Sequence, residues 1–109
     1  MIESADVTTL MKTLADPTRR AVYERIMRKG EATVGELVRG SQVSQPAISQ
    51  HLRALRNAGL VSEERKGRQV FYRPQPGGLA PLVDWISHYN QFWRERFDRI
   101  ETLLKEMDQ

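Results

Sequence analysis

Apolar side chains recur every three or four residues through much of the first half of the chain, which predicts short helices. The first helix is predicted over residues 5–15, with its apolar stripe at Val7, Leu10, Met11 and Leu14. A second is predicted over residues 17–29, because Asp16 is a favourable N-cap and Pro17 suits the first helical position. Gly30 is expected to end this helix as a left-handed cap. Its expected buried positions are Ala21, Val22, Ile26 and Met27.

The next segment, residues 33–58, predicts two further helices joined by a short turn. Thr33 and Glu36 have the spacing of a capping box, and Gly40 is expected to end this short helix. Ser44 is expected to cap the helix that follows. The apolar positions of that last helix fall at i, i+4 and i+7, namely Ile48, Leu52 and Leu55. Two short helices connected in this way predict a helix-turn-helix.

After Gly59 the period of the pattern changes from helical to two, which predicts a β-hairpin over residues 60–73 with a basic turn at 66–68. A segment rich in proline and glycine follows, and residues 79–107 then predict one long helix. The expected fold is mainly α with a small β-hairpin wing. It is a single winged helix-turn-helix domain over residues 1–109, with a long C-terminal dimerisation helix.

The composition narrows the class of protein. A chain of 109 residues suits one domain, and the sequence holds no apolar run of membrane-spanning length and no signal-peptide pattern at its start. We therefore expect a cytoplasmic protein without a membrane partner. The chain has no cysteine, which excludes disulfides and thiolate metal ligands.

Charge is distributed unevenly along the chain. The segment 39–73 holds seven basic and two acidic residues, a balance of +5, whereas the whole chain carries +3. No Asp or Glu lies between Glu36 and Glu63, although that stretch includes the whole second helix of the helix-turn-helix. Acid-free polar helices and basic loops suit a polyanion, so double-stranded DNA is the expected partner.

The polar side chains of this helix and of the hairpin are assigned to two kinds of DNA contact. The residues expected to read bases are Gln45, Ser49, Gln50 and Arg53. The residues expected to hold the phosphate backbone are Ser44, His51, Arg56, Lys66 and Arg68. For His51 two interpretations stay open: a phosphate contact, or a hydrogen bond to a neighbouring backbone group.

The segments ADPTRRAVYERI and VSQPAISQHLRALRNAGLVSEERKGRQVFY resemble the ArsR-type winged-helix repressors over roughly residues 10 to 73. The resemblance implies a homodimeric bacterial regulator that binds a palindromic operator and usually represses. The family's recognition-helix pattern falls on Ser44, Gln45, Ser49, Gln50 and His51, and its basic wing on Lys66, Gly67 and Arg68. The end of the chain resembles members that do not sense metals and that act as simple autorepressors or respond to unknown signals.

Metal sensing is not expected. Family members with one kind of metal site carry Cys in the helix where this chain reads Gly35 to Arg39, and no Cys occurs there. A second kind of site uses Asp and His pairs on the last helix, where only Asp84 and His88 share a face. Two ligands are too few for a closed site. We expect no metal and no other cofactor.

The long last helix carries two apolar stripes. The first has heptad-like spacing and predicts a dimer interface together with the first helix, at Leu10, Leu14, Val83, Ile86, Asn90, Trp93, Phe97, Ile100 and Leu104. The second stripe is expected to pack on the body of the same chain, at Leu82, Trp85, Tyr89 and Phe92.

Two alternative functions stay open beside a homodimeric DNA-binding repressor. One is a regulator whose small apolar effector binds in a groove lined by Trp85, Tyr89, Phe92 and Trp93. Another is a winged-helix module for protein interaction, although such a module needs neither a basic wing nor an acid-free helix. An enzyme is not expected, because no residue orients a histidine beside a nucleophile and no glycine-rich phosphate loop is present.

Overall fold

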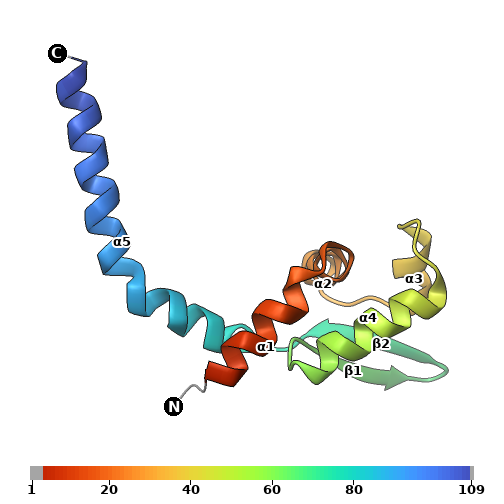
Figure 1. Ribbon diagram of the computed structural model, residues 1–109. Helices are drawn as coiled ribbons and strands as arrows, with labels where there is room; N and C mark the ends of the chain where they lie inside the picture. Colours follow the sequence, from red (N-terminus) through yellow and green to blue (C-terminus); the bar gives the residue numbers. More distant parts are fainter. Residues whose placement is uncertain (1–3, 109) are drawn as a thin grey trace.

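The computed structural model describes residues 4–108, which form helices and one antiparallel hairpin (Figure 1). In chain order the elements are α1 (Ser4–Ala15), α2 (Pro17–Lys29), α3 (Val34–Arg39), α4 (Gln45–Asn57), β1 (Val61–Lys66), β2 (Gln69–Pro74) and α5 (Ala80–Met107). The predicted fold class, mainly helical with a small hairpin wing and a long last helix, is confirmed.

Side-chain caps fix the starts of α2 and α3. The Asp16 carboxylate accepts the backbone N–H of Arg19 at 3.0 Å, and this hydrogen bond lowers the pKa of Asp16. The Thr33 hydroxyl accepts the N–H of Glu36 at 3.2 Å, while the Glu36 carboxylate accepts the N–H of Thr33 at 2.9 Å. That backbone bond, helped by the Lys29 ammonium, lowers the pKa of Glu36 to about 2. Both predicted caps are confirmed.

The core lies where α1, α2, α3 and α4 meet the base of the hairpin. Its side chains are Leu10, Val22, Tyr23, Ile26, Ala32, Leu37, Ile48, Leu52, Leu55, Leu60 and Val61. The predicted stripe of α2 was partly wrong, because Ala21 and Met27 are exposed and Tyr23 is buried. The buried face of α2 is set by α1 on one side and by α4 and β2 on the other, and these contacts centre it between Val22 and Tyr23.

The hairpin is regular and attached along both strands. β1 and β2 are antiparallel up to the pair Lys66 and Gln69, so the connection is two residues long, shorter than the predicted three-residue turn. It begins at Gly67, whose φ of +63° favours glycine. On its other edge β2 bonds the loop before α3, because Ala32 and Tyr72 exchange backbone hydrogen bonds of 2.8 and 3.0 Å. The wing is therefore held at a fixed angle to the helices.

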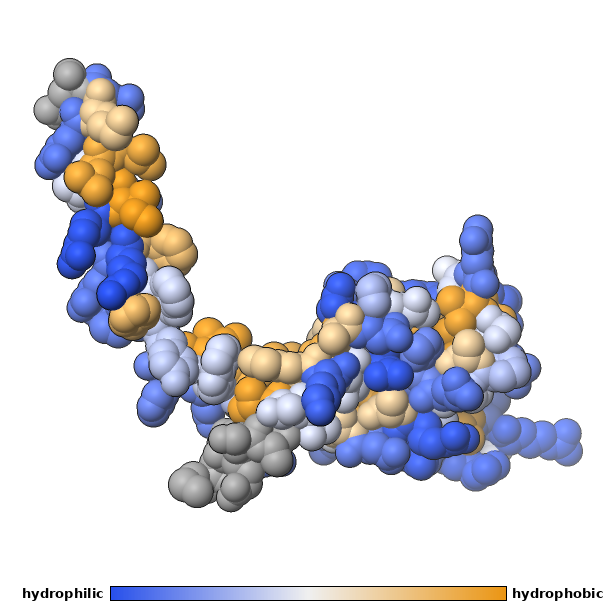
Figure 2. Space-filling model, viewed as in Figure 1, coloured by the Kyte–Doolittle hydropathy of each residue, from blue (hydrophilic) through white to orange (hydrophobic). Residues whose placement is uncertain are grey.

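Only the first turn of α5 packs on the rest of the chain. Leu79 and Leu82 contact the core, beside α1, whereas every side chain from 83 to 108 is exposed. Figure 1 shows α5 leaving the body next to α1 and changing direction part-way along its length. In Figure 2, apolar surface runs along the projecting helix. No helix within residues 4–108 is long and apolar enough to cross a membrane.

This arrangement corrects two predictions about apolar residues. The stripe expected to pack on the body does so only at Leu82, because α5 diverges from the body after its first turn and leaves Trp85, Tyr89 and Phe92 exposed. Leu10 was predicted in the dimer interface, but its side chain is 2% exposed within the single chain and has no surface left for a partner. Leu14 is half-buried at the edge of the same core.

Candidate nucleic-acid interface

The orientation of α4 is fixed by its cap and by its apolar side. The Ser44 hydroxyl accepts the N–H of Ala47 at 3.3 Å, so the predicted cap is present. Ile48, Leu52 and Leu55 are at most 1% exposed and hold one side of α4 in the core. A helix anchored along a single stripe must present its other side to solvent.

The outward side of α4 is polar and free of acids. Successive side chains are about 100° apart around a helix, which places Gln50 and Arg53 opposite the buried stripe, and both are exposed. Gln45 is exposed in the first turn, whereas Ser49 is half-buried on the flank that faces the hairpin. Amide and guanidinium groups on an outward face of this kind match the donors and acceptors of base edges in a major groove.

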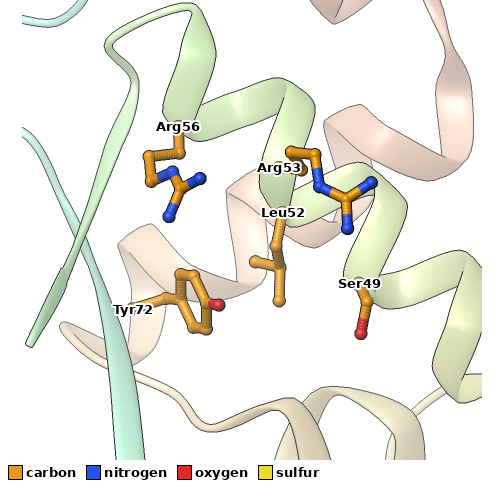
Figure 3. Close-up of a pocket in the computed structure, with 5 residues that line it drawn as sticks. All are labelled: Ser49, Leu52, Arg53, Arg56 and Tyr72. Atoms are coloured by element: carbon orange, nitrogen blue, oxygen red, sulfur yellow. The ribbon is translucent and has the colours of Figure 1, made fainter. Parts of the chain in front are cut away.

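A shallow depression of about 180 Å³ separates α4 from β2. Figure 3 shows the side chains that line it, with Ser49, Leu52, Arg53 and Arg56 from α4 opposite Tyr72 from β2. Partial burial raises the pKa of Tyr72, and the nearby Glu63 carboxylate raises it further. The depression is therefore lined by two guanidinium groups and by two hydroxyls that stay protonated at neutral pH, and all four can bond phosphate oxygens.

Two of the cations assigned to phosphate contact already have carboxylate partners. Arg56 forms an ion pair with Glu63, and the Lys66 ammonium lies 3.4 Å from Glu31. The pKa of Glu31 is lowered, first by its hydrogen bond from Arg73 and then by Lys66. These carboxylates compete with phosphate for the same cations. Arg53 and Arg68 form no ion pair with any residue between 4 and 108, so both charges are directly available.

Arg65 belongs beside these residues, although the sequence did not predict it among the DNA contacts. In β1 it pairs with Val70, so it lies on the same face of the hairpin as Tyr72, two positions along β2. That is the face turned toward α4. Lys66 lies on the opposite face, where its ammonium is 5.1 Å from the centre of the Phe71 ring. Strand alternation was the signal that distinguishes these two neighbouring cations.

His51 lies on the other flank of α4, toward α2. Its Nδ1 accepts a hydrogen bond from Nε of Arg19 at 3.3 Å, and the residue is half-buried. The hydrogen bond to a neighbouring backbone group, one of the two interpretations of this histidine, is replaced by a bond to a side chain from another helix.

The residues considered for other ligands lie on α5. Among residues 4–108 no three His, Cys, Asp or Glu side chains gather as a metal cluster would require. The aromatic residues of the alternative effector groove lie along one helix and are between 43% and 53% exposed, namely Trp85, Tyr89, Phe92 and Trp93. The distance between neighbouring ring centres is 5.4 Å for the first two and 5.0 Å for the last two. In a single chain these rings form a surface and do not enclose a ligand.

A capped recognition helix with an acid-free outward face, followed by a hairpin with a basic tip, defines a winged helix-turn-helix DNA-binding protein. The model of the bacterial regulatory proteins of the arsR family matches residues 16–63, which include α2, α3 and α4. The chain belongs to the arsR family, and it is a DNA-binding transcriptional regulator.

Similar proteins agree with this assignment. The chain is 45% identical to the HTH-type transcriptional regulator Rv2034 of Mycobacterium tuberculosis, over 73% of this chain and 71% of that one. It is 46% identical to the arsenic resistance transcriptional regulator ArsR1 of Pseudomonas putida, over 77% and 68% of the two chains. The crystal structure of an ArsR family transcriptional regulator, RHA00566, superposes with a TM-score of 0.73 at 26% identity and covers 86% of this chain and 97% of its own.

Proposed function

We propose that the protein is a homodimeric repressor that binds a palindromic DNA operator. The observation that carries this proposal is the outward face of α4, where Gln50 and Arg53 are exposed with no acid among the helix residues. A helix of this kind can enter a major groove without repulsion from the phosphates on its two walls. The hairpin beside it would reach the flanking backbone.

Dimerisation is supported by the exposed stripe of α5. Its large apolar members are between 52% and 61% exposed, namely Val83, Ile86, Trp93, Phe97, Ile100 and Leu104. A continuous apolar stripe of this length is unfavourable on an isolated protein and is typical of an interface. A second copy of α5 offers the same stripe with two-fold symmetry, which suits a palindromic site. Asn90 lies within the stripe, where a polar residue can fix the register of two helices.

The proposed DNA contacts fall into base contacts and phosphate contacts according to where each side chain lies on α4 or on the hairpin. We assign base contacts to Gln45, Ser49, Gln50 and Arg53, on the first turns and outward face of α4. We assign phosphate contacts to Ser44, His51, Arg56, Lys66 and Arg68, and add Arg65 on the hairpin face toward α4. Arg56 and Lys66 must exchange their carboxylate partners for phosphate, so Arg68 should contribute more to affinity than either of them.

Salt dependence of operator binding tests this division. A dimer that neutralises about three or four phosphates per subunit should give a slope of about −5 to −7 for log affinity against log salt concentration. Arg68→Ala should weaken binding to operator and scrambled duplex alike and flatten the slope by about one unit for each phosphate that a subunit no longer neutralises. Gln50→Ala should keep the slope and reduce discrimination by about 1–3 kcal/mol for each base pair that it reads.

Lys12→Ala on α1 is the matched control, because it removes one exposed positive charge from a different part of the body. It should leave both the slope and the discrimination close to those of the unmodified protein. If Arg68→Ala abolishes sequence discrimination while Gln50→Ala lowers only general affinity, the hairpin reads bases and α4 holds phosphates, which is the reverse of our assignment.

We further propose that release of the operator does not depend on arsenite or on a transition metal. A relative of 46% identity carries arsenic resistance in its name, yet this chain holds no cysteine and therefore no thiolate ligand for arsenite. Stoichiometric arsenite, zinc or nickel should leave the operator complex intact in a fluorescence anisotropy titration. Release by zinc or nickel that is abolished in His88→Ala would contradict the proposal, and so would release by arsenite.

A further inference from the structure

A single side-chain contact joins the start of α2 to the recognition helix. The Nε–H of Arg19 donates to Nδ1 of His51 at 3.3 Å, and another nitrogen of the same guanidinium lies 3.5 Å from the carbonyl oxygen of Thr13. The backbone of Arg19 is itself anchored, because its N–H is held by the capping carboxylate of Asp16. The guanidinium therefore reaches His51 from a fixed point on α2.

This contact determines which ring nitrogen of His51 carries the proton. An arginine can only donate, so Nδ1 must offer its lone pair and the ring must be neutral. In a neutral imidazole the proton is then on Nε2. No residue between 4 and 108 forms a hydrogen bond with Nε2 of His51. The Nε2–H of this half-buried ring is thus a donor without a partner among the described residues.

The position of the His51 ring on α4 indicates which part of a DNA duplex its Nε2–H could contact. At about 100° per residue, His51 and Ser49 lie on opposite flanks of α4, with Gln50 between them on the outward face. Ser49 borders the depression against the hairpin, while His51 borders α2. A helix in a major groove has one phosphate wall on each flank. The hairpin side has several cations, and His51 is the donor of α4 on the α2 side.

We propose that Arg19 is a positioning residue for DNA binding, which holds His51 as the Nε2–H tautomer so that this N–H donates to a phosphate on the α2 side of the groove. The inference rests on the proposed function, since it requires α4 to lie in a major groove. Arg19 acts through the imidazole and need not touch DNA itself. His51 then contributes a neutral, directional donor on the α2 side of the groove, whereas the hairpin contributes positive charge on the other side.

The tautomer is tested first, on the protein without DNA. Nitrogen-15 spectra of the histidine rings at about pH 8 should show a protonated Nε2 and an unprotonated Nδ1 for His51. In Arg19→Ala the two nitrogens should move toward averaged shifts. Arg20→Ala is the matched control, because the Arg20 guanidinium bonds the carbonyl oxygen of Leu14 and not the ring, and it should leave the spectrum unchanged. A protonated Nδ1 in the unmodified protein would overturn the proposal.

Operator binding then tests the role of the contact with a double-mutant cycle. His51→Ala should weaken binding about tenfold for each subunit, as expected when a hydrogen bond to a charged phosphate is removed, and Arg19→Ala should weaken it by a smaller factor. The double variant should bind no worse than His51→Ala, because Arg19 acts only through the ring. Arg19→Gln, which keeps an N–H donor, should lie between Arg19→Ala and the unmodified protein, and thermal unfolding confirms that each variant is folded.

The outcomes separate this proposal from the function on which it rests. Additive losses of affinity in the double variant would mean that Arg19 contacts DNA directly, and they would overturn the positioning role. Unchanged affinity in folded His51→Ala would overturn the phosphate contact. If Gln50→Ala and Arg68→Ala also left binding unchanged, the proposed use of α4 and the hairpin would be wrong as well, whereas the ring spectra would still report the Arg19 contact.

Discussion

The body of the protein and its last helix use apolar side chains in opposite ways. In the body the core side chains are nearly inaccessible, and Ile26, Leu37 and Leu55 are 0% exposed. Along α5 the large apolar side chains beyond Leu82 are between 43% and 79% exposed. The body therefore completes its own core, whereas the same chain leaves the large apolar side chains of α5 uncovered. We infer that fold stability resides in the body and that assembly resides in α5.

A charge placed in the stripe of α5 should have the largest effect. Trp93→Glu should separate the dimer, because two carboxylates would face each other in an apolar seam. Without bivalent attachment, operator binding should weaken by about 100-fold or more, measured by fluorescence anisotropy. Gln91→Glu adds the same charge to an exposed side chain off the stripe. It loses the hydrogen bond to Glu95 but leaves the apolar seam intact, so operator binding should change little. Equal operator affinity of the two variants would contradict the assignment of assembly to α5.

A cavity in the body should affect folding directly. Leu52→Ala removes a side chain that is 1% exposed and should lower the free energy of unfolding by about 2–5 kcal/mol. Leu104→Ala truncates the same residue type at a position that is 56% exposed in the single chain. Its effect should appear as weaker dimerisation, and so depend on protein concentration in urea titrations. Equal, concentration-independent losses of stability in both variants would show that α5 is part of the body.

The cap of α4 should have a smaller effect. Ser44→Ala removes the acceptor for the N–H of Ala47 and should lower the free energy of unfolding by about 1 kcal/mol. Chemical denaturation measures this decrease, and Ser44→Asp, which restores an acceptor, should recover most of it. If Ser44→Ala unfolded like the unmodified protein, the start of α4 would be held by packing alone.

The charge of Glu36 should give the smallest effect and a defined pH dependence. Its pKa falls from 4.5 to about 2 on folding, so its ionised form stabilises the folded state above pH 4.5. That contribution should disappear progressively as the pH falls from 4.5 toward 2. Glu36→Gln keeps a side-chain acceptor without the charge. Its deficit in unfolding free energy should be constant near neutral pH and shrink below pH 4.5, and a deficit that grew with acid would contradict the assignment.

The features that were predictable from the sequence are local. The caps at Asp16, Thr33 and Ser44 depend on residues three positions away, and the buried stripe of α4 depends on helical spacing alone. The hairpin followed from its alternation, but its turn is one residue shorter than predicted, because strand pairing extends to Lys66. The acid-free helix and the basic hairpin predicted DNA as the partner, and family resemblance added the expectation of a homodimeric repressor on a palindromic operator.

The features that were missed depend on how elements far apart in the chain meet. The buried face of α2 is set by three neighbours, so Tyr23 replaced Ala21 and Met27. The ion pair of Lys66 with Glu31 joins residues 35 positions apart, and the bond of Arg19 with His51 joins residues 32 positions apart. No periodicity within one helix or strand encodes such contacts. The direction in which α5 leaves the body was missed for the same reason.

Sedimentation equilibrium of the unmodified protein at micromolar concentration tests whether the protein is a dimer through α5. We propose that a second copy of the chain covers the exposed stripe of α5 and that this dimer binds DNA. A single chain has a mass of 12.6 kDa, so we expect the free protein to have twice that mass and one palindromic operator to bind two chains. A species of 12.6 kDa that still binds the operator with full affinity would contradict it.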